Sequence, residues 1–232
     1  MKKYFLFFCA CVLIANICYG QTNFTRGEEL FMQNKPAEAL VFFENSIAED
    51  PAHVQAFLYL GIVYEQLGRL DEAIAVYRRI LSRAGDMAAL ISTNLGNVYF
   101  RRGNFENAEE FYSQAVSGDS GYSSAYLGRA NTRIKTGALR EAVADYELYI
   151  TLEPRSSKRP EIERLIAFIR SEFAAEERRR LLAEEAAREE AERRQRLLDE
   201  LAASLQSAAD GSQGLSTGAE NVESYEGEFE LE

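Results

Sequence analysis

The chain has 232 residues and a formal net charge of −11, from 37 acidic and 26 basic residues. This balance argues against a nucleic-acid partner, because phosphate binding requires a surplus of lysine and arginine on one face. There is no tryptophan, and long stretches are rich in alanine, glutamate, arginine and leucine, a composition that favours an all-α fold.

Residues 1–20 have the anatomy of a secretory signal peptide. Lys2 and Lys3 form a basic head, residues 4–15 are an almost unbroken apolar run, and Gly20 is a small residue before a possible cleavage point. The run is shorter than the roughly 20 apolar residues that a membrane-spanning helix needs. We therefore expect this leader to be removed during export to the periplasm or cell envelope.

All three cysteines, Cys9, Cys11 and Cys18, lie inside this leader. A mature chain without it has no disulfide, thiol nucleophile or cysteine-based metal site. Lipidation of Cys18 is an alternative, although Ile17 is bulky where a lipoprotein places a small residue. Membrane association is expected only if Cys18 is lipidated or the leader is kept as an anchor.

A pattern of small and aromatic residues recurs four times after the leader. One series of small residues is spaced 34, 35 and 34 positions apart: Gly27, Gly61, Gly96 and Ala130. Two further series keep the same phase: Ala39, Ala73, Ala108 and Ala142, and then Phe43, Tyr77, Tyr112 and Tyr146. Each copy holds two stretches with apolar residues three and four positions apart, which indicates a pair of helices. Residues that tolerate a left-handed backbone stand between the two helices of each pair: Asn34, Gly68, Gly103 and Gly137.

These positions resemble the signature of the tetratricopeptide repeat family, W-x2-L-G-x2-Y followed by A-x3-F and P. The copies span residues 20–53, 54–88, 89–122 and 123–156. The resemblance implies an all-α superhelical solenoid of four helical hairpins that binds protein. The chain departs from the signature at several places: Asn23 and Ser92 replace the aromatic residue, and Arg26 and Arg129 replace the leucine.

Residues 157–210 predict a capping helix that continues as a long charged helix. Pro160 suits a first helical turn, and one apolar stripe follows it: Ile162, Leu165, Ile166, Ile169 and Phe173. We expect this stripe to cover the exposed face of the last hairpin. Asp210 and Gly211 form a plausible helix stop.

From residue 174 onward the helix is expected to be solvated. Glutamate precedes arginine by four residues at five places: Glu176–Arg180, Glu184–Arg188, Glu189–Arg193, Glu190–Arg194 and Glu192–Arg196. Weak helical pairing, and hence weak self-association, is the alternative. The best heptad register, from Ile169 to Leu201, has four charged residues among its ten seam positions, which makes a poor coiled-coil seam.

Residues 211–232 predict a disordered acidic tail, because they contain too little apolar surface to fold alone. The end of this tail, residues 225–232, alternates glutamate with apolar residues or glycine, which suits an extended segment with one apolar edge. One hypothesis is that it docks in the groove described next, and the other is that it only keeps the protein soluble.

No catalytic, cofactor or metal motif is present: we find no phosphate loop, dinucleotide-type glycine cluster, nucleophile elbow or paired-histidine zinc motif. His53 is the single histidine, falls between the first two copies, and is interpreted as a surface loop residue. An enzymatic function is therefore not expected.

The resemblance implies that the first helix of each hairpin lines a concave groove for a partner peptide or helix. By position, the lining residues are Phe24, Glu28, Phe31, Leu58, Ile62, Glu65, Thr93, Asn97, Arg101, Leu127, Asn131 and Lys135. Asn97 and Asn131 offer a donor and an acceptor to a peptide backbone, or they satisfy neighbouring helices. Arg101 and Lys135 are placed to meet a carboxylate. Chaperone-binding members carry a further lysine where this chain has Thr93 and Leu127, so their carboxylate clamp is expected to be absent.

The sequence therefore predicts a non-catalytic adaptor in the bacterial cell envelope that binds a protein or peptide partner. The alternatives are a spacer or oligomerisation protein that acts through the long helix, and a subunit of an outer-membrane assembly complex.

Overall fold

The computed structural model describes residues 22–218, with side chains described as far as Asp210. The predicted leader, including Cys18, and the tail beyond Gly218 lie outside the described residues. Within 22–218 the chain is helical and contains no strand. The described chain divides into two units between Ile169 and Arg170.

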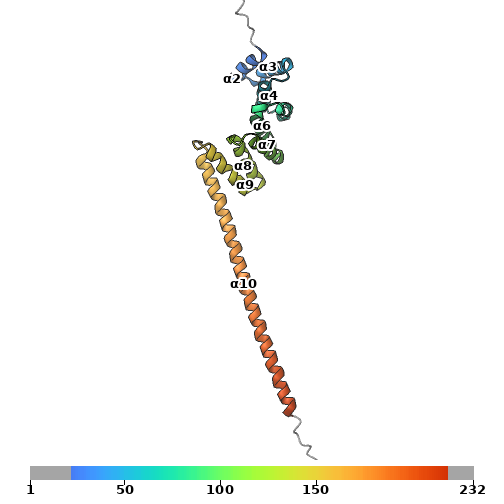
Figure 1. Cartoon of the computed structure of the whole chain (residues 1–232), viewed down its shortest axis with the longest axis vertical. Helices are drawn as coiled ribbons and strands as arrows, with labels where there is room; N and C mark the ends of the chain where they lie inside the picture. The colour runs from blue at the N-terminus through green and yellow to red at the C-terminus, as the bar shows by residue number, and fades with distance from the viewer. Residues whose placement is uncertain (1–21, 219–232) are drawn as a thin grey trace, which may run out of the picture. The chain divides into compact units, whose positions relative to one another are not determined.

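The described part of the first unit, residues 22–169, contains eight α-helices arranged as four consecutive hairpins and then the start of a further helix (Figure 1). The hairpins are α2 (Asn23–Met32) with α3 (Pro36–Glu49), α4 (Val54–Gln66) with α5 (Leu70–Leu81), α6 (Ala88–Arg101) with α7 (Phe105–Gly118), and α8 (Ser123–Thr136) with α9 (Leu139–Leu152). A short 3₁₀ turn, Gly85–Met87, precedes α6, and α10 spans Arg159–Gly218. The all-α solenoid of four hairpins is thus confirmed.

The connection inside each hairpin contains the left-handed residue that the sequence predicts. Asn34 has a φ of 58°, and Gly68, Gly103 and Gly137 have φ values of 74°, 74° and 82°. A left-handed residue turns the chain while its N–H still bonds the last helical carbonyls. In the last hairpin, the N–H of Gly137 bonds the carbonyl of Ile134.

The small residues of the first series allow the two helices of a hairpin to approach closely. A Cβ atom on Gly61 would lie 2.2 Å from the Tyr77 ring, and one on Gly96 would lie 2.7 Å from the Tyr112 ring. Each aromatic ring therefore occupies the space that a side chain on the facing helix would need. The rings of Tyr77 and Tyr112 are almost wholly buried, so this packing forms the centre of the core.

His53 is not a simple surface residue. It caps α4, because its Nδ1 accepts a hydrogen bond from the backbone N–H of Ala56 at 3.1 Å. Its ring also lies against Phe24, with centroids 4.6 Å apart. The lone histidine is thus explained by a local structural role.

Arg129, which replaces the signature leucine, lies in an ionic cluster that joins three helices. Its guanidinium donates two hydrogen bonds to the Asp145 carboxylate, at 2.7 and 2.8 Å, and a third to Ser113 on α7 at 3.2 Å. Arg133 donates to Asp145 at 2.8 Å and to Glu109 on α7 at 2.7 Å. Asp145 is only 1% exposed, so two arginines neutralise one buried carboxylate.

The predicted capping stripe is buried. Ile162, Ile166 and Ile169 are 5, 6 and 4% exposed, and Leu165 is half-buried. The preceding turn is held by a hydrogen bond of 2.8 Å between the hydroxyls of Tyr149 and Ser156. The start of α10 therefore serves as the cap that the apolar spacing predicts.

The second unit, as far as it is described, is the continuation of α10. The helix passes through Gly211 to Gly218, so the stop expected at Asp210–Gly211 is wrong. One glycine inside a helix costs only about 1 kcal/mol relative to alanine, which is too little to end a long helix without a capping contact.

The ion pairs along this part of α10 also differ from those expected. Arg180 pairs with Glu177 at 2.6 Å and with Glu184 at 3.6 Å, and Arg188 pairs with Glu192 at 3.7 Å. None of the five predicted glutamate-before-arginine pairs forms among the side chains described. These side chains are exposed, and a solvated arginine reaches partners on either side with nearly equal energy.

Candidate partner-binding face

The twelve predicted lining residues are distributed three to a helix on α2, α4, α6 and α8, the first helices of the four hairpins. The structure does not expose all of them. Leu58 is 7% and Thr93 is 4% exposed, so these two predicted residues are buried and not accessible to a partner. Leu58 belongs to the main hydrophobic core, and the Thr93 hydroxyl is buried with no hydrogen-bond partner among the described residues.

Two tyrosine hydroxyls fix the orientation of the predicted asparagines. Tyr112 donates to Asn97 Oδ1 at 2.7 Å, and Tyr146 donates to Asn131 Oδ1 at 2.6 Å. Both asparagines are exposed. Because each amide oxygen accepts a hydrogen bond from a tyrosine hydroxyl, each amide NH₂ group remains available as a donor on the surface.

Burial raises the pKa of Tyr112 and Tyr146, and the nearby carboxylates of Glu65 and Glu161 act in the same direction. Both phenols therefore stay protonated at neutral pH and remain donors. The asparagine at each of these positions is held in one orientation by its own hairpin. The spacing of Tyr112 and Tyr146 in the repeat is visible in the sequence, but their contact with Asn97 and Asn131 is not.

In the second hairpin the position of the asparagines is taken by Ile62, and the hydroxyl of Tyr77 bonds elsewhere. It donates to Glu65 Oε1 at 2.8 Å, one helical turn further along α4. The other oxygen of Glu65 lies 3.3 Å from Arg101 Nη1 on α6. Burial raises the pKa of Glu65, whereas the hydrogen bond from Tyr77 and the charge of Arg101 lower it by less.

This contact changes the prediction for the two cationic residues. Arg101 is engaged by Glu65, and its Nη2 also donates to the Glu65 backbone carbonyl at 3.4 Å. Its side chain is still 47% exposed, so a role of Arg101 in meeting a partner's carboxylate stays a prediction. Lys135 is exposed and has no partner among the side chains that the structure describes.

The predicted residues of α2 form an aromatic cluster with Tyr59 of α4. The rings of Phe24 and Phe31 lie 5.8 and 5.2 Å from the Tyr59 ring, both nearly edge-on. The Tyr59 hydroxyl donates to Glu28 at 3.1 Å. These three residues of α2 thus help to join the first two hairpins.

The start of α10 borders the candidate binding face at the fourth hairpin. A cavity of about 250 Å³ is lined by Leu127, Asn131, Tyr146, Lys158, Glu161, Ile162 and Leu165. The first turns of α10 therefore lie beside Leu127 and Asn131. This contribution of α10 to the face is not evident from the repeat pattern.

A second cavity, of about 390 Å³, lies among α3, α4 and α5, away from the predicted lining residues. Its walls include Phe57, Leu60 and Tyr64. The Arg79 guanidinium lies 5.1 Å from the Phe57 ring, and Tyr64 donates to Glu44 at 2.9 Å. This cavity is not predicted by the repeat resemblance, because that resemblance assigns partner binding to the first helix of each pair.

Between residues 22 and 210, no group of three histidine, cysteine, aspartate or glutamate side chains is placed to bind a metal ion. Of the helices that are described, none has both the length and the apolar character required to cross a membrane.

Two family models, both described as tetratricopeptide repeats, match residues 52–120 and 93–157. Among curated proteins, the chain is 31% identical over 107 residues to the "Probable UDP-N-acetylglucosamine--peptide N-acetylglucosaminyltransferase SPINDLY" of Hordeum vulgare, a match that covers 44% of this chain and 11% of that protein. It is 23% identical over 128 residues to "Lipopolysaccharide assembly protein B" of Escherichia coli K12, covering 54% of this chain and 30% of that protein. The chain therefore spans less than a third of these relatives.

Among solved structures, MamA superposes with a TM-score of 0.57 at 19% identity, over 64% of this chain and 84% of that one. A likeness at this identity shows the fold alone. The two curated relatives differ in organism and in their named roles. The repeats that they share with this chain therefore do not identify one activity.

Proposed function

Residues 52–157 belong to the tetratricopeptide repeat family, and on this premise we propose that the chain is a non-catalytic scaffold for a partner protein. It binds an extended peptide or a helix along α6 and α8. Its location is the bacterial cell envelope. The leader anatomy and the likeness to an Escherichia coli lipopolysaccharide assembly protein support this location.

One observation carries the proposal: two exposed amide donors, on Asn97 and Asn131, recur at equivalent positions of consecutive hairpins. Each donor is oriented beforehand by a buried tyrosine, so little side-chain freedom is lost when a partner binds. Backbone carbonyls of an extended peptide recur at regular intervals and are good acceptors for such a row of donors.

The test is site-specific photocrosslinking in intact bacteria. A photoreactive residue at position 97 and, separately, at position 131 is expected to capture the same partner. The control position is Glu110, which is exposed on α7, the second helix of its hairpin. Equal capture from position 110, or different partners at 97 and 131, would contradict the proposed face.

A second candidate function places the activity in α10, as a spacer or oligomerisation element. The exposed leucines of the second unit favour this candidate. A role as a subunit of an outer-membrane assembly complex is compatible with either candidate.

A further inference from the structure

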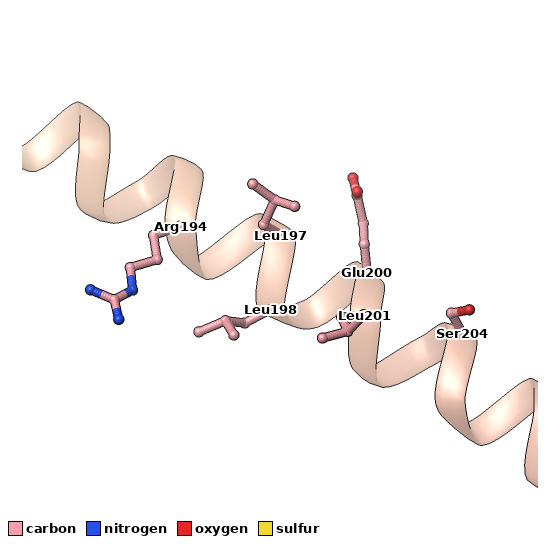
Figure 2. A pocket seen from close by; sticks show the side chains of 6 residues that line it. All are labelled: Arg194, Leu197, Leu198, Glu200, Leu201 and Ser204. Carbon is pink, nitrogen blue, oxygen red and sulfur yellow. The ribbon is translucent and has the colours of Figure 1, made fainter.

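Near its described end, α10 leaves a cluster of large apolar side chains in solvent. Leu197, Leu198, Leu201 and Leu205 are 62, 52, 59 and 64% exposed. Figure 2 shows Leu198 and Leu201 projecting on the same side of the helix as Arg194, which precedes Leu198 by about one turn and Leu201 by about two. Four leucines within nine residues are unusual on a helix that is otherwise charged, and such patches mark interaction sites.

Two of these leucines, Leu197 and Leu201, belong to a longer stripe with alternating spacings of four and three residues, the spacing of a coiled-coil seam. The stripe runs along one face of α10 through Ala183, Ala187, Glu190, Arg194, Leu197 and Leu201. The side chains at the start of the stripe are small alanines and those at its end are large leucines. Two residues of opposite charge, Glu190 and Arg194, lie between them. Among the side chains that are described, neither Glu190 nor Arg194 has an ion-pair partner.

We propose that this stripe pairs in antiparallel orientation with the same stripe of a second copy of the chain. The register places Glu190 of each copy opposite Arg194 of the other, so that two ion pairs form across the two-fold axis. The same register places Leu197 against Ala187 and Leu201 against Ala183. Each large side chain thus meets a small one, which lets the helices approach towards the short end of the usual 8–10 Å spacing.

Other pairings of two copies are less favourable. A parallel pair in register sets Glu190 against Glu190 and Arg194 against Arg194, which is repulsive at the seam. An antiparallel register that matches leucine with leucine sets Arg194 against Ser204 and Glu190 against Ala208, so both charges lose their partners. Only the register centred between Glu190 and Arg194 satisfies size and charge together. This register therefore pairs two of the four seam charges that weaken a parallel coiled coil, Glu190 and Arg194.

The pairing is tested by sedimentation of the full chain at concentrations from roughly 1 µM to 1 mM. The wild-type chain is expected to shift from monomer to dimer across this range. Leu201→Glu is expected to raise the dissociation constant at least about tenfold, because it introduces a charge opposite Ala183. The matched control is Leu181→Glu: Leu181 is 53% exposed but lies on the other side of the helix, so its dissociation constant stays unchanged.

Orientation is tested by charge reversal. Glu190→Arg and Arg194→Glu are each expected to weaken the dimer, and the double reversal is expected to restore it, because only the antiparallel register again pairs opposite charges. A parallel pair would make all four proteins equal. A wild-type chain that stays monomeric at the highest concentration, a Leu201→Glu variant equal to the control, or a double reversal no tighter than the single ones would each overturn the inference.

Discussion

The buried carboxylate of Asp145 provides the sharpest test of how the last hairpin is held together. Replacing Asp145 with alanine removes the acceptor of three hydrogen bonds of 2.7–2.8 Å and leaves Arg129 and Arg133 without their shared counter-charge. The two arginine side chains are only 14 and 17% exposed, so water compensates little. Breaking a buried ion pair in this way costs about 3–5 kcal/mol, and we expect the lower end because Glu109 still neutralises Arg133.

The assay is urea denaturation followed by circular dichroism, with Asp86→Ala as a control. Asp86 is exposed in the turn before α6, so its replacement is expected to change stability by less than about 0.5 kcal/mol. The double variant Arg129→Leu, Asp145→Val reproduces the apolar pair that the second hairpin has at Leu60 and Val76. It is expected to recover most of the lost stability, because an apolar pair of fitting size replaces a buried ion pair at little cost. A loss below about 1 kcal/mol for Asp145→Ala would refute this reasoning.

Three further changes probe other parts of the chain. Thr93→Val is expected to stabilise the protein by about 1 kcal/mol in the same denaturation assay, since it removes a buried hydroxyl without a partner; a loss of stability would contradict this. Ile166→Asp is expected to lower stability by several kcal/mol, roughly 3 or more, because it buries a charge in the cap; unchanged thermal unfolding would show that the cap contributes little. Burial raises the pKa of Glu65 above its ordinary 4.5, so ionisation of this group costs stability as the pH rises through the raised value. Relative to Glu65→Gln, the wild-type chain should lose stability with rising pH in that window, and parallel pH profiles would contradict the assignment.

The repeat spacing predicted the helices and the left-handed turns, and the apolar stripe after the repeats predicted the cap, because these depend on contacts within one hairpin or between neighbours in sequence. Gly61 facing Tyr77 and the buried face of Ile162 and Ile166 are examples. The spacing predicted less about the candidate face, because it defines only which side of a helix a residue occupies. It did not predict that Thr93 is buried, nor that Glu65 would engage Arg101 from the next hairpin.

The ionic cluster of the last hairpin could have been predicted from the sequence by comparing the repeat copies. Positions 60 and 76, and again positions 95 and 111, hold apolar pairs in the second and third hairpins. In the fourth hairpin both members of the pair change together, to Arg129 and Asp145. A charge that replaces a core leucine requires a counter-charge at the facing position, so comparison of the copies would have predicted the contact.

The buried tyrosines also separate a binding role of the asparagines from a purely structural one. Replacing Asn97 and Asn131 with alanine removes both surface donors, and each lost hydrogen bond costs about 0.5–1.5 kcal/mol, so the partner's dissociation constant should rise roughly 5- to 150-fold. Tyr112→Phe keeps Asn97 but frees its amide to rotate, so it is expected to cause a smaller loss of affinity. The measurement is a titration of the crosslinked partner's binding segment into each variant. If the asparagine variant binds as tightly as the wild-type chain while its thermal stability falls, the two amides serve only their own hairpins, and the partner lies elsewhere on the solenoid.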